Sequence, residues 1–420
     1  MYTKYELDNY NIYLVKMKKF KTITISINFR RENARGDCVY SALLKNMLLL
    51  ATAKYHDLDE LSKAKMDIYA PHISITTYLS GKERNICIEG TFADEKYTET
   101  SMNEKSIKFI MDYFWDPYVE NNSFNKETFN ICKYRYIEQL KNTKDNPDDY
   151  IKTKLDEKMD IMPFDVETIN DCIQMAEKIT AKDLYKYYKS IFNEDALDIF
   201  VAGDFADEKM LDIIKPLVKG NFKQSYKNRI IERCKPKKEI KEFIEQLPNE
   251  QSKLAIGLKQ YGLNEFERKY SSLAYFNILG GGWNSKLNKS VRGKNSMCYY
   301  IYTSRLMTFN VGFIHSGISS ENYEKVLNLI KQEMKNIKDG KITEEELNIV
   351  KETYINALTN IEDSQVETLD SIISEIFSDT DPIKERIKNI KKVTIQDVKN
   401  VASKIEIDTI YLLKGECKWP

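Results

Sequence analysis

The sequence contains few of the residues that build metal sites and disulfide frameworks. Only three histidines occur in 420 residues, and no two of His56, His72 and His315 are four residues apart. The seven cysteines are scattered without a C-x-x-C pair. Protein zinc sites need closely spaced imidazoles or thiolates, and disulfide frameworks normally use an even number of cysteines. The sequence therefore argues against a histidine-rich metal site on this chain and favours reduced thiols.

Long apolar runs and an excess of one charge are also absent. No stretch approaches the roughly 20 apolar residues of a membrane span, and the first residues, MYTKYELDNY, lack the apolar core of a signal peptide. Lys plus Arg and Asp plus Glu both total 64, and no basic cluster is interleaved with aromatic residues in the manner of a nucleic-acid-binding surface. We therefore expect a cytoplasmic protein that binds neither membrane nor nucleic acid.

The second half of the chain repeats the pattern of the first. Residues 179–203 and 393–415 each begin with a Thr that can cap a helix whose third residue is Asp, and each continues into a short apolar strand that ends in Gly. Earlier in each half, an alternating strand is followed by helices and then by a pair of strands. The predicted strands cover residues 22–29, 73–79 and 85–93 in the first half and 253–260, 297–303 and 309–317 in the second.

This repeat predicts an α/β (α+β) fold with two homologous lobes, each a mixed, mainly antiparallel sheet flanked by helices. With 42% hydrophobic residues, the chain has enough apolar surface for two packed cores. We expect an N-terminal lobe at residues 1–218 and a C-terminal lobe at residues 244–420. The Lys- and Arg-rich segment 219–243 is the expected linker between them, and its charges are typical of a solvated connector.

The strongest local signal is the stretch LGGGWNSKLNKSVRGKNSMCYYIYT, residues 279–303. Gly280, Gly281 and Gly282 permit tight turns and close approach of another segment, but they match neither G-x-G-x-x-G nor G-x-x-x-x-G-K-[ST]. Their plain structural use would be the C-terminus of a helix. Arg292 and Tyr299 carry hydrogen-bond donors suited to a peptide carbonyl, although they could equally form a surface ion pair and a packed aromatic residue.

The same stretch resembles the second-lobe signature of the pitrilysin, insulin-degrading and mitochondrial processing peptidase family, which are inverzincin zinc peptidases. That signature combines a Gly-rich turn, a Ser before a basic residue and Leu, a V-R pair, and a Tyr seven residues after the Arg. The matching residues here are Ser285, Lys286, Leu287, Val291, Arg292 and Tyr299. The chain departs from the family at Gly293, Asn295 and Ser296, where the family tends to have Glu, Arg and Gly. The resemblance implies that the Arg and the Tyr contact bound substrate.

The resemblance also implies a degenerate zinc site in the first lobe. Residues 42–52, ALLKNMLLLAT, predict a helix with Ala42, Lys45 and Asn46 on one face. The family's H-x-x-E-H motif, which is followed by M-L, falls on these three positions. The family's third ligand, a Glu before a D-x-P, falls on Gln139, with Glu138 as the alternative alignment. No metal ligand or catalytic residue is then expected on this chain.

The strand FKTITISINFRRE near the start further resembles the YmfF-like branch, whose members lack the zinc motif and are typically encoded beside a relative that has it. The resemblance therefore implies a non-catalytic, substrate-binding subunit of a heterodimeric metallopeptidase, with zinc on an HxxEH-containing paralogous partner that cleaves peptides. Two alternatives remain open, a structural scaffold subunit without a role in proteolysis and a stand-alone peptide-binding protein. Retention of the Arg and the Tyr favours the substrate-binding subunit over the scaffold.

Overall fold

The computed structural model describes residues 2–159, 167–223, 239–248 and 251–415. Contacts within the chain divide it into two compact units, and each unit contains segments from both halves of the sequence. Unit 1 comprises residues 1–141, 167–228 and 361–379. Unit 2 comprises residues 142–166, 229–360 and 380–420.

Unit 1 is built on a six-stranded sheet with the strand order β1-β2-β8-β3-β5-β4. All neighbouring strands are antiparallel except β2 and β8, which run parallel. A two-stranded hairpin of β6 (Val119–Glu120) and β7 (Ser123–Phe124) lies apart from this sheet. The main strands are β1 (Tyr2–Glu6), β2 (Asn11–Lys16), β3 (Thr22–Glu32), β4 (His72–Ser80), β5 (Glu83–Ala93) and β8 (Ala196–Gly203).

Unit 2 is built on a five-stranded sheet with the order β11-β12-β10-β13-β9. Its one parallel pair is β9 with β13, so β9-β13-β10-β12-β11 corresponds strand for strand to β2-β8-β3-β5-β4 of unit 1. This correspondence confirms the prediction of two homologous lobes. The strands are β9 (Lys241–Leu247), β10 (Ser252–Gln260), β11 (Cys298–Leu306), β12 (Val311–Ile318) and β13 (Ile405–Gly415).

The repeated capping sequences begin equivalent helices in the two units. Thr180 and Asp183 form a capping box at the start of α7 (Ala181–Glu194), which leads into β8. Thr394 and Asp397 form the same box at the start of α14 (Ile395–Ala402), which leads into β13. In each box the Thr side chain and the Asp side chain bond each other's backbone N–H, so two helix-end donors are satisfied together.

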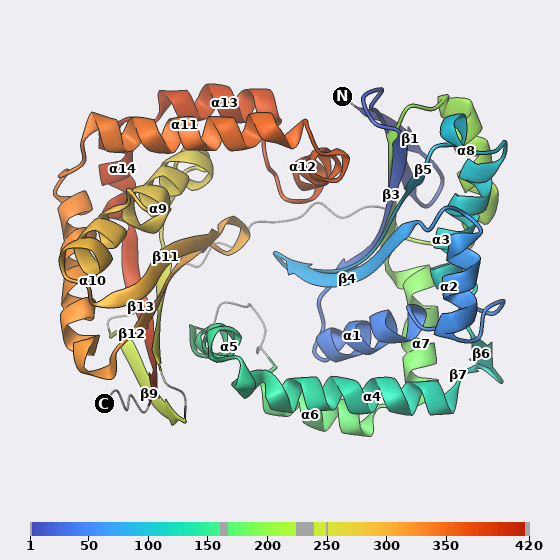
Figure 1. The fold of residues 1–420 in the computed structure, drawn as a ribbon, viewed down its shortest axis with the longest axis horizontal. Helices are drawn as coiled ribbons and strands as arrows, with labels where there is room; N and C mark the ends of the chain where they lie inside the picture. Colours follow the sequence, from blue (N-terminus) through green and yellow to red (C-terminus); the bar gives the residue numbers. More distant parts are fainter. Residues whose placement is uncertain (1, 160–166, 224–238, 249–250, 416–420) are drawn as a thin grey trace. The chain divides into compact units, whose positions relative to one another are not determined.

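Alternation along the strands gives the unit 1 sheet one apolar and one polar face. Ile23, Ile25, Ile27 and Phe29 of β3 are fully buried in the main core, where one helix layer covers them. In Figure 1 this layer lies on the side of the sheet away from α12 (Gln365–Phe377). It is formed by α1 (Asp37–Leu48), α2 (Leu58–Met66), α3 (Met102–Trp115), α4 (Lys126–Lys141), α6 (Ile169–Lys178), α7 and α8 (Asp207–Ile214).

The helices of unit 2 repeat this arrangement on one face of its sheet. Residues of α9, α10, α11, α13 and α14 share a single core with β10, β11, β12 and β13, and Figure 1 shows α9, α10 and α14 on the side of the sheet opposite α5. The helices not yet given bounds are α9 (Ser272–Gly280), α10 (Tyr323–Lys338), α11 (Glu344–Ile361) and α13 (Ile383–Lys392).

Two helices pack on the sheet of the other half of the sequence. The first-half helix α5 (Pro147–Met159) contacts β10 and β13 in unit 2, and the second-half helix α12 (Gln365–Phe377) contacts β8 in unit 1. A Cβ added at Gly257 of β10 would lie 2.0 Å from the sulfur of Met159, so the glycine makes room for α5. Each exchanged helix covers the sheet face that the main helix layer leaves open (Figure 1).

The exchanged helices and the start of β9 change the expected domain boundaries. Unit 1 contains α12 as well as most of residues 1–218, and unit 2 contains α5 as well as most of residues 244–420. Of the expected linker, residues 224–238 lie outside the described residues, and Lys241 already begins β9. The sequence pattern of a helix shows which of its faces is apolar, but it does not show which sheet that face covers. Two lobes that are each continuous in sequence are therefore the simplest prediction.

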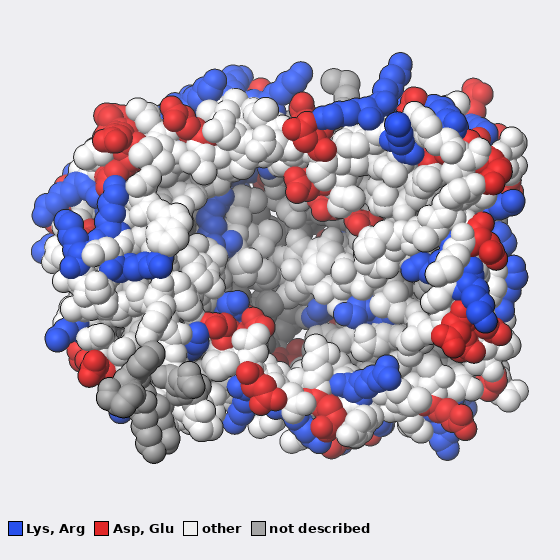
Figure 2. Space-filling model, in the orientation of Figure 1, with Lys and Arg blue, Asp and Glu red and all other residues white. Residues whose placement is uncertain are grey.

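Neither positive nor negative side chains predominate on the displayed surface. Figure 2 shows Lys and Arg side chains interspersed with Asp and Glu side chains over both units on the face displayed. This mixture agrees with the formal net charge of zero. None of the helices in the described part of the chain has the length and apolar character needed to cross a membrane.

Candidate functional site

The expected zinc-site positions lie on two helices that pack together in unit 1. Ala42, Lys45 and Asn46 lie on α1, and Gln139 lies near the end of α4, which contacts α1. A methyl group, an ammonium group and two amides offer no imidazole or carboxylate for zinc. The alternative residue, Glu138, pairs with Lys141 at 3.1 Å. The described residues contain no group of three or more His, Cys, Asp or Glu that could hold a metal ion.

We expect the purified chain to bind no stoichiometric zinc, because a single carboxylate at Glu138 cannot replace a set of three ligands. Elemental analysis after dialysis against zinc-containing buffer measures this directly. A content of about one tightly held zinc per chain, lost in the Glu138→Gln variant, would contradict the expectation.

The Gly-rich turn ends α9 and brings it close to β11. Gly280 is the last residue of the helix and Gly281 is its C-cap, which confirms the plain structural use of these glycines. A Cβ added at Gly280 would lie 2.5 Å from Cγ2 of Thr303 and 3.0 Å from the Thr303 backbone nitrogen. Gly282 has a φ of +132°, a conformation that residues with side chains rarely adopt. The turn therefore requires glycine both for contact and for conformation.

Gly280→Ala should destabilise the protein by roughly 1–3 kcal/mol, because the added methyl group would push α9 away from β11. Gly293→Ala is the matched control, since a Cβ at Gly293 would meet only the carbonyl oxygen of Asn288, at 3.4 Å. Denaturant unfolding of the two variants measures the difference. Equal stabilities for both would show that the close contact at Gly280 is not needed.

Two polar side chains hold the turn after α9 in place. The hydroxyl of Ser285 donates to the carbonyl oxygen of Gly282 at 2.6 Å. The amide of Asn288 donates to the carbonyl oxygens of Gly282, at 3.0 Å, and of Ile301 on β11, at 2.9 Å. No sequence pattern indicates this role of Asn288, because a spacing rule does not identify bonds to backbone carbonyls such as those of Gly282 and Ile301.

The other signature residues before the Arg also have structural roles. Lys286 pairs with Glu346 of α11 at 3.0 Å. Leu287 and Val291 are fully buried in the core of unit 2. These contacts account for the Ser, the basic residue, the Leu and the Val of the signature as parts of the fold.

Arg292 and Tyr299 differ from the rest of the signature, because neither side chain forms a hydrogen bond or an ion pair with any described residue. Arg292 lies in a π-helical turn, Asn288–Lys294, with its guanidinium 4.3 Å above the ring of Trp283. Trp283 is 74% exposed and Tyr299 is 55% exposed. Burial raises the pKa of Cys298, the residue before Tyr299, and the positive charge of Arg292 opposes this shift. The donors of both residues are available to a ligand.

Tyr299 owes its exposure to an irregularity in β11, the edge strand of the sheet. Cys298 pairs with Ile318 and Tyr300 pairs with Gly317, so Tyr299 is an extra residue at a β-bulge. Bulges bend a strand locally and redirect a side chain. Sequence alone does not reveal this bulge, because the strand pattern continues on both sides of it.

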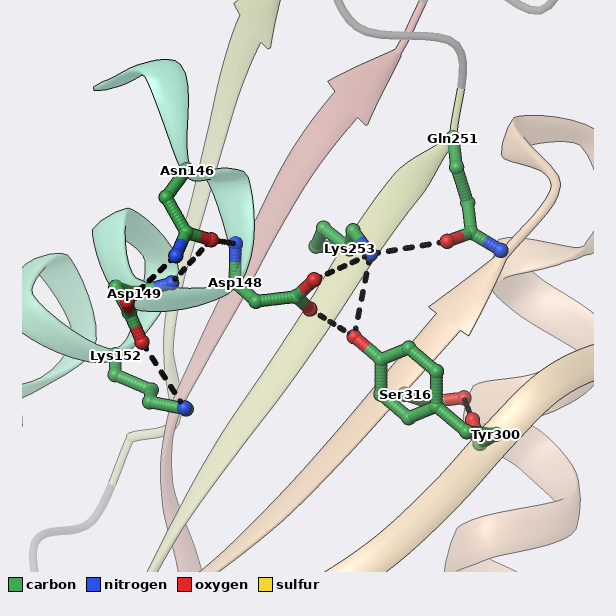
Figure 3. A network of polar contacts seen from close by, with 8 residues as sticks. All are labelled: Asn146, Asp148, Asp149, Lys152, Gln251, Lys253, Tyr300 and Ser316. Carbon is green, nitrogen blue, oxygen red and sulfur yellow. Dashed lines mark hydrogen bonds and ion pairs between the residues drawn. The ribbon is translucent and has the colours of Figure 1, made fainter. Parts of the chain in front are cut away.

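The neighbouring residue, Tyr300, is fixed by the exchanged helix α5. Its hydroxyl bonds the carboxylate of Asp148, which also accepts from Lys253 of β10 at 2.8 Å. Lys253 donates to Gln251 as well, at 3.0 Å. Behind Tyr300, the hydroxyl of Ser316 donates to the Tyr300 carbonyl oxygen at 2.8 Å. Figure 3 shows these groups converging from α5, β10, β11 and β12, and they hold the segment around the bulge.

The protonation states of this network are those of a structural ion pair. Burial would raise the pKa of Asp148, but its bonds to Lys253 and Tyr300 outweigh burial and lower the pKa. Burial, together with the bond to Asp148, raises the pKa of Tyr300. Asp148 therefore stays charged and Tyr300 stays neutral near neutral pH, so the network keeps its bonds and does not titrate there.

Two residues without an assigned role in the sequence analysis are inert in the structure. His315 lies on β12 with 6% exposure, and burial lowers its pKa to about 4, so it is a packed, neutral histidine at neutral pH. Cys38 of α1 lies 3.9 Å from Cys172 of α6, sulfur to sulfur, a partner that the sequence did not indicate. The bond to Cys172, followed by burial, raises the pKa of Cys38, so its thiol is a poor nucleophile.

Comparison with known proteins shows that the chain is similar to M16 peptidases. The family model described as "Peptidase M16 inactive domain" matches residues 178–354, a range that includes the Gly-rich turn, Arg292 and Tyr299. The chain is 26% identical over 411 residues to the "Probable inactive metalloprotease YmfF" of Bacillus subtilis, covering 96% of this chain and 95% of that protein. It is 24% identical over 259 residues to the "Uncharacterized zinc protease YmxG" of the same organism, with 60% of each protein covered.

Solved structures show the same fold over the full length. A conserved protein from Enterococcus faecalis superposes with a TM-score of 0.90 at 22% identity, with both chains fully covered. A protease from Helicobacter pylori gives a TM-score of 0.78 at 14% identity, covering 99% of each chain. Pitrilysin gives a TM-score of 0.72 at 14% identity, and the match covers 99% of this chain and 43% of pitrilysin. The two-lobe architecture is thus shared by proteins with little sequence in common.

Proposed function

We propose that this chain, an inactive homologue of the M16 peptidases, is the non-catalytic, substrate-binding subunit of a heterodimeric zinc metallopeptidase. It supplies Arg292 and Tyr299 to the active-site chamber of a paralogous partner. The partner carries the HxxEH motif and the zinc ion, and it cleaves peptides. We place the heterodimer in the cytoplasm.

The observation that supports this proposal most strongly is that some signature residues bond within the fold, whereas the side chains of Arg292 and Tyr299 form no such bond with the described residues. Ser285 and Lys286 use their polar groups to hold the fold. Arg292 and Tyr299 leave theirs without a partner among the described residues, and Tyr299 is displaced outward by a bulge. A guanidinium and a phenol can both donate to a peptide carbonyl. Their bonds strengthen when that carbonyl becomes an oxyanion during attack by water, so they would favour the transition state over bound substrate.

The contact between Trp283 and the guanidinium of Arg292 also supports a substrate-binding role for Arg292. A cation above an aromatic face is attracted by about 0.5–1 kcal/mol at an exposed site. Stacking at 4.3 Å thus limits the positions of the Arg292 side chain but uses none of its N–H donors. Such an arrangement orients a donor for a ligand, whereas a salt bridge would consume it.

Co-purification with the HxxEH-bearing relative from the same organism tests the proposal. We expect a one-to-one complex by size exclusion and native mass spectrometry, with about one zinc per complex, and we expect the zinc to be lost when the first His of the partner's motif is replaced. Absence of a complex, together with peptide binding by this chain alone, would instead identify a stand-alone peptide-binding protein.

A complex whose hydrolysis does not depend on Arg292 or Tyr299 would identify a scaffold subunit. The two alternatives therefore give different results in the same preparation, because one lacks the complex and the other lacks the contribution of this chain to catalysis.

A further inference from the structure

The second sheet face of unit 1 is polar. On β3 the side chains of Thr24, Ser26, Asn28 and Arg30 alternate with the buried apolar series. The equivalent positions on β4 and β5 carry Ser74, Thr76, Tyr78, Ser80, Cys87 and Glu89. The helix α12 covers part of this face, with Leu369 and Phe377 packed in a small apolar cluster that includes Phe200 of β8.

A cavity of about 380 Å³ lies between this polar face and α12. The strands contribute hydroxyl, amide, thiol and carboxylate groups to its wall. The helix α12 contributes a second carboxylate and one hydroxyl, and its C-cap residue Ser378 contributes another hydroxyl. The polar residues that matter most here are Ser26, Asn28, Tyr78, Glu89, Asp370 and Ser374. All of them belong to unit 1.

The two carboxylates of the cavity have no partner. Neither Glu89 nor Asp370 forms a hydrogen bond or an ion pair with any residue in the described ranges. Burial, followed by the charge of Asp370, raises the pKa of Glu89, and burial, followed by the charge of Glu367, raises the pKa of Asp370. The exposed His72 on β4 opposes this shift at Glu89 without bonding to it. The cavity thus holds negative charge that its own walls leave uncompensated.

The buried cation nearest to this face is already neutralised. Arg30 is 2% exposed and pairs with Glu83 at 2.8 Å and with Asp198 at 2.7 Å. Two carboxylates around one guanidinium add a further net negative charge beneath the cavity. Arg30 is therefore not available to Glu89 or Asp370 as a counter-ion.

A buried hydrogen-bond acceptor without a donor next to the cavity also indicates a ligand that carries donors. The amide nitrogen of Asn85, a residue with 1% exposure, donates to the hydroxyl of Tyr78 at 2.6 Å and to the side-chain oxygen of Asn28 at 3.2 Å, both in the cavity wall. Its own side-chain oxygen is buried and has no hydrogen-bond partner among the described residues. Buried acceptors without donors are rare in folded proteins. This unused acceptor and the two unpaired carboxylates of the wall favour a ligand that brings N–H donors and positive charge.

We propose that this cavity binds the side chain of a Lys or Arg residue of the peptide that the subunit holds. The assignment rests on the proposed function for the peptide itself, but the recognition of a basic side chain comes from the cavity alone. An ammonium or guanidinium group presents several N–H donors, which can bond the two carboxylates and the surrounding hydroxyls at once. A cavity of this volume has room for the aliphatic part of such a side chain as well as for its charged end.

Fluorescence anisotropy with paired peptides tests the proposal on the isolated chain and on the co-purified complex. The probes are fluorescein-labelled Gly-Ser-Arg-Ser-Gly and the same peptide with citrulline, which keeps the shape of arginine but removes the charge. We expect the citrulline peptide to bind about tenfold more weakly, the usual effect of losing a charged hydrogen bond. Asp370→Asn and Glu89→Gln should each weaken the arginine peptide by about the same factor and leave the citrulline peptide nearly unchanged.

Glu367→Gln provides the matched control, since Glu367 is an exposed carboxylate of the same helix and is absent from the cavity wall. Its substitution should change the ratio between the two peptides far less than Asp370→Asn does, because Glu367 acts on Asp370 only through its charge and does not line the cavity. Equal affinity for the two peptides, or no measurable affinity for either, would overturn the proposal without affecting the assay of the heterodimer. Tighter binding of free spermidine than of the arginine peptide would also overturn it, because the occupant would then be a free polyamine.

Discussion

Replacing Arg292 with Ala, or Tyr299 with Phe, should lower peptide hydrolysis by the heterodimer about a hundredfold, the usual effect of removing one donor from an oxyanion site. Both donors lack a partner among the residues that the structure describes, so each can bond the substrate carbonyl and strengthen that bond as charge develops. The loss should appear mainly in kcat, because the bond to the oxyanion of the transition state is much stronger than the bond to the carbonyl of the bound substrate. Steady-state kinetics with a peptide substrate measures it.

Matched substitutions nearby separate the chemical role from a general disturbance of the surface. Lys294→Ala removes an exposed positive charge from the same turn as Arg292, and Tyr302→Phe removes a hydroxyl from the same strand as Tyr299. Both controls should retain normal turnover, and all four variants should elute as intact heterodimers. Normal turnover in the Arg292 and Tyr299 variants would make the chain a scaffold and the two residues ordinary surface groups.

Replacing Arg30 with Met should destabilise unit 1 by roughly 3–5 kcal/mol, the typical effect of removing one partner from a buried ion pair. Arg30 is 2% exposed and its guanidinium also lies 3.8 Å from the centre of the Phe377 ring on α12. Without the guanidinium, the carboxylates of Glu83 and Asp198 would remain buried with no counter-charge. Denaturant unfolding measures the loss.

A second set of variants distinguishes charge from packing at this site. Adding Glu83→Gln and Asp198→Asn to Arg30→Met should recover part of the lost stability, because the remaining groups are then neutral. Lys4→Met is the surface control, since its partner Glu6 is largely exposed and such pairs contribute less than about 1 kcal/mol. If Arg30→Met and Lys4→Met have equally small effects, the buried cluster does not stabilise the fold.

Much of the fold follows from local sequence patterns. Alternation predicted β3, β10 and the two strand pairs, and the Thr and Asp spacing predicted the capping boxes of α7 and α14. These features depend on interactions between residues close in sequence, which is why a single chain reveals them. The duplication was visible for the same reason, because both halves repeat these local patterns in the same order.

The exchange of α5 and α12 between the sheets could not be predicted in this way. The exchange depends on packing between residues that are far apart in sequence, such as the space that Gly257 leaves for Met159. The beginning of β9 was missed for a related reason. Lys241–Leu247 forms the edge of its sheet, and its pairing with β13 compensates for a sequence that resembles a charged linker.

The candidate site also has features that the sequence predicts and features that only the folded chain shows. The sequence signature located Arg292 and Tyr299, but their lack of partners, the stacking on Trp283 and the bulge at Tyr299 are properties of the folded chain. The cavity between α12 and the polar sheet face could not be predicted from the sequence at all. Glu89 and Asp370 come from opposite halves of the chain and meet only because α12 joins unit 1.

Titrating this chain into a fixed concentration of the zinc-bearing partner, while recording peptide hydrolysis, tests the central claim most directly. The account predicts almost no hydrolysis by either protein alone and a rate that rises with added chain until the two are equimolar. It also predicts that the Arg292→Ala variant forms the complex at the same ratio but reaches a plateau about a hundredfold lower. Full hydrolysis by the partner alone, unchanged by any amount of this chain, would contradict the account.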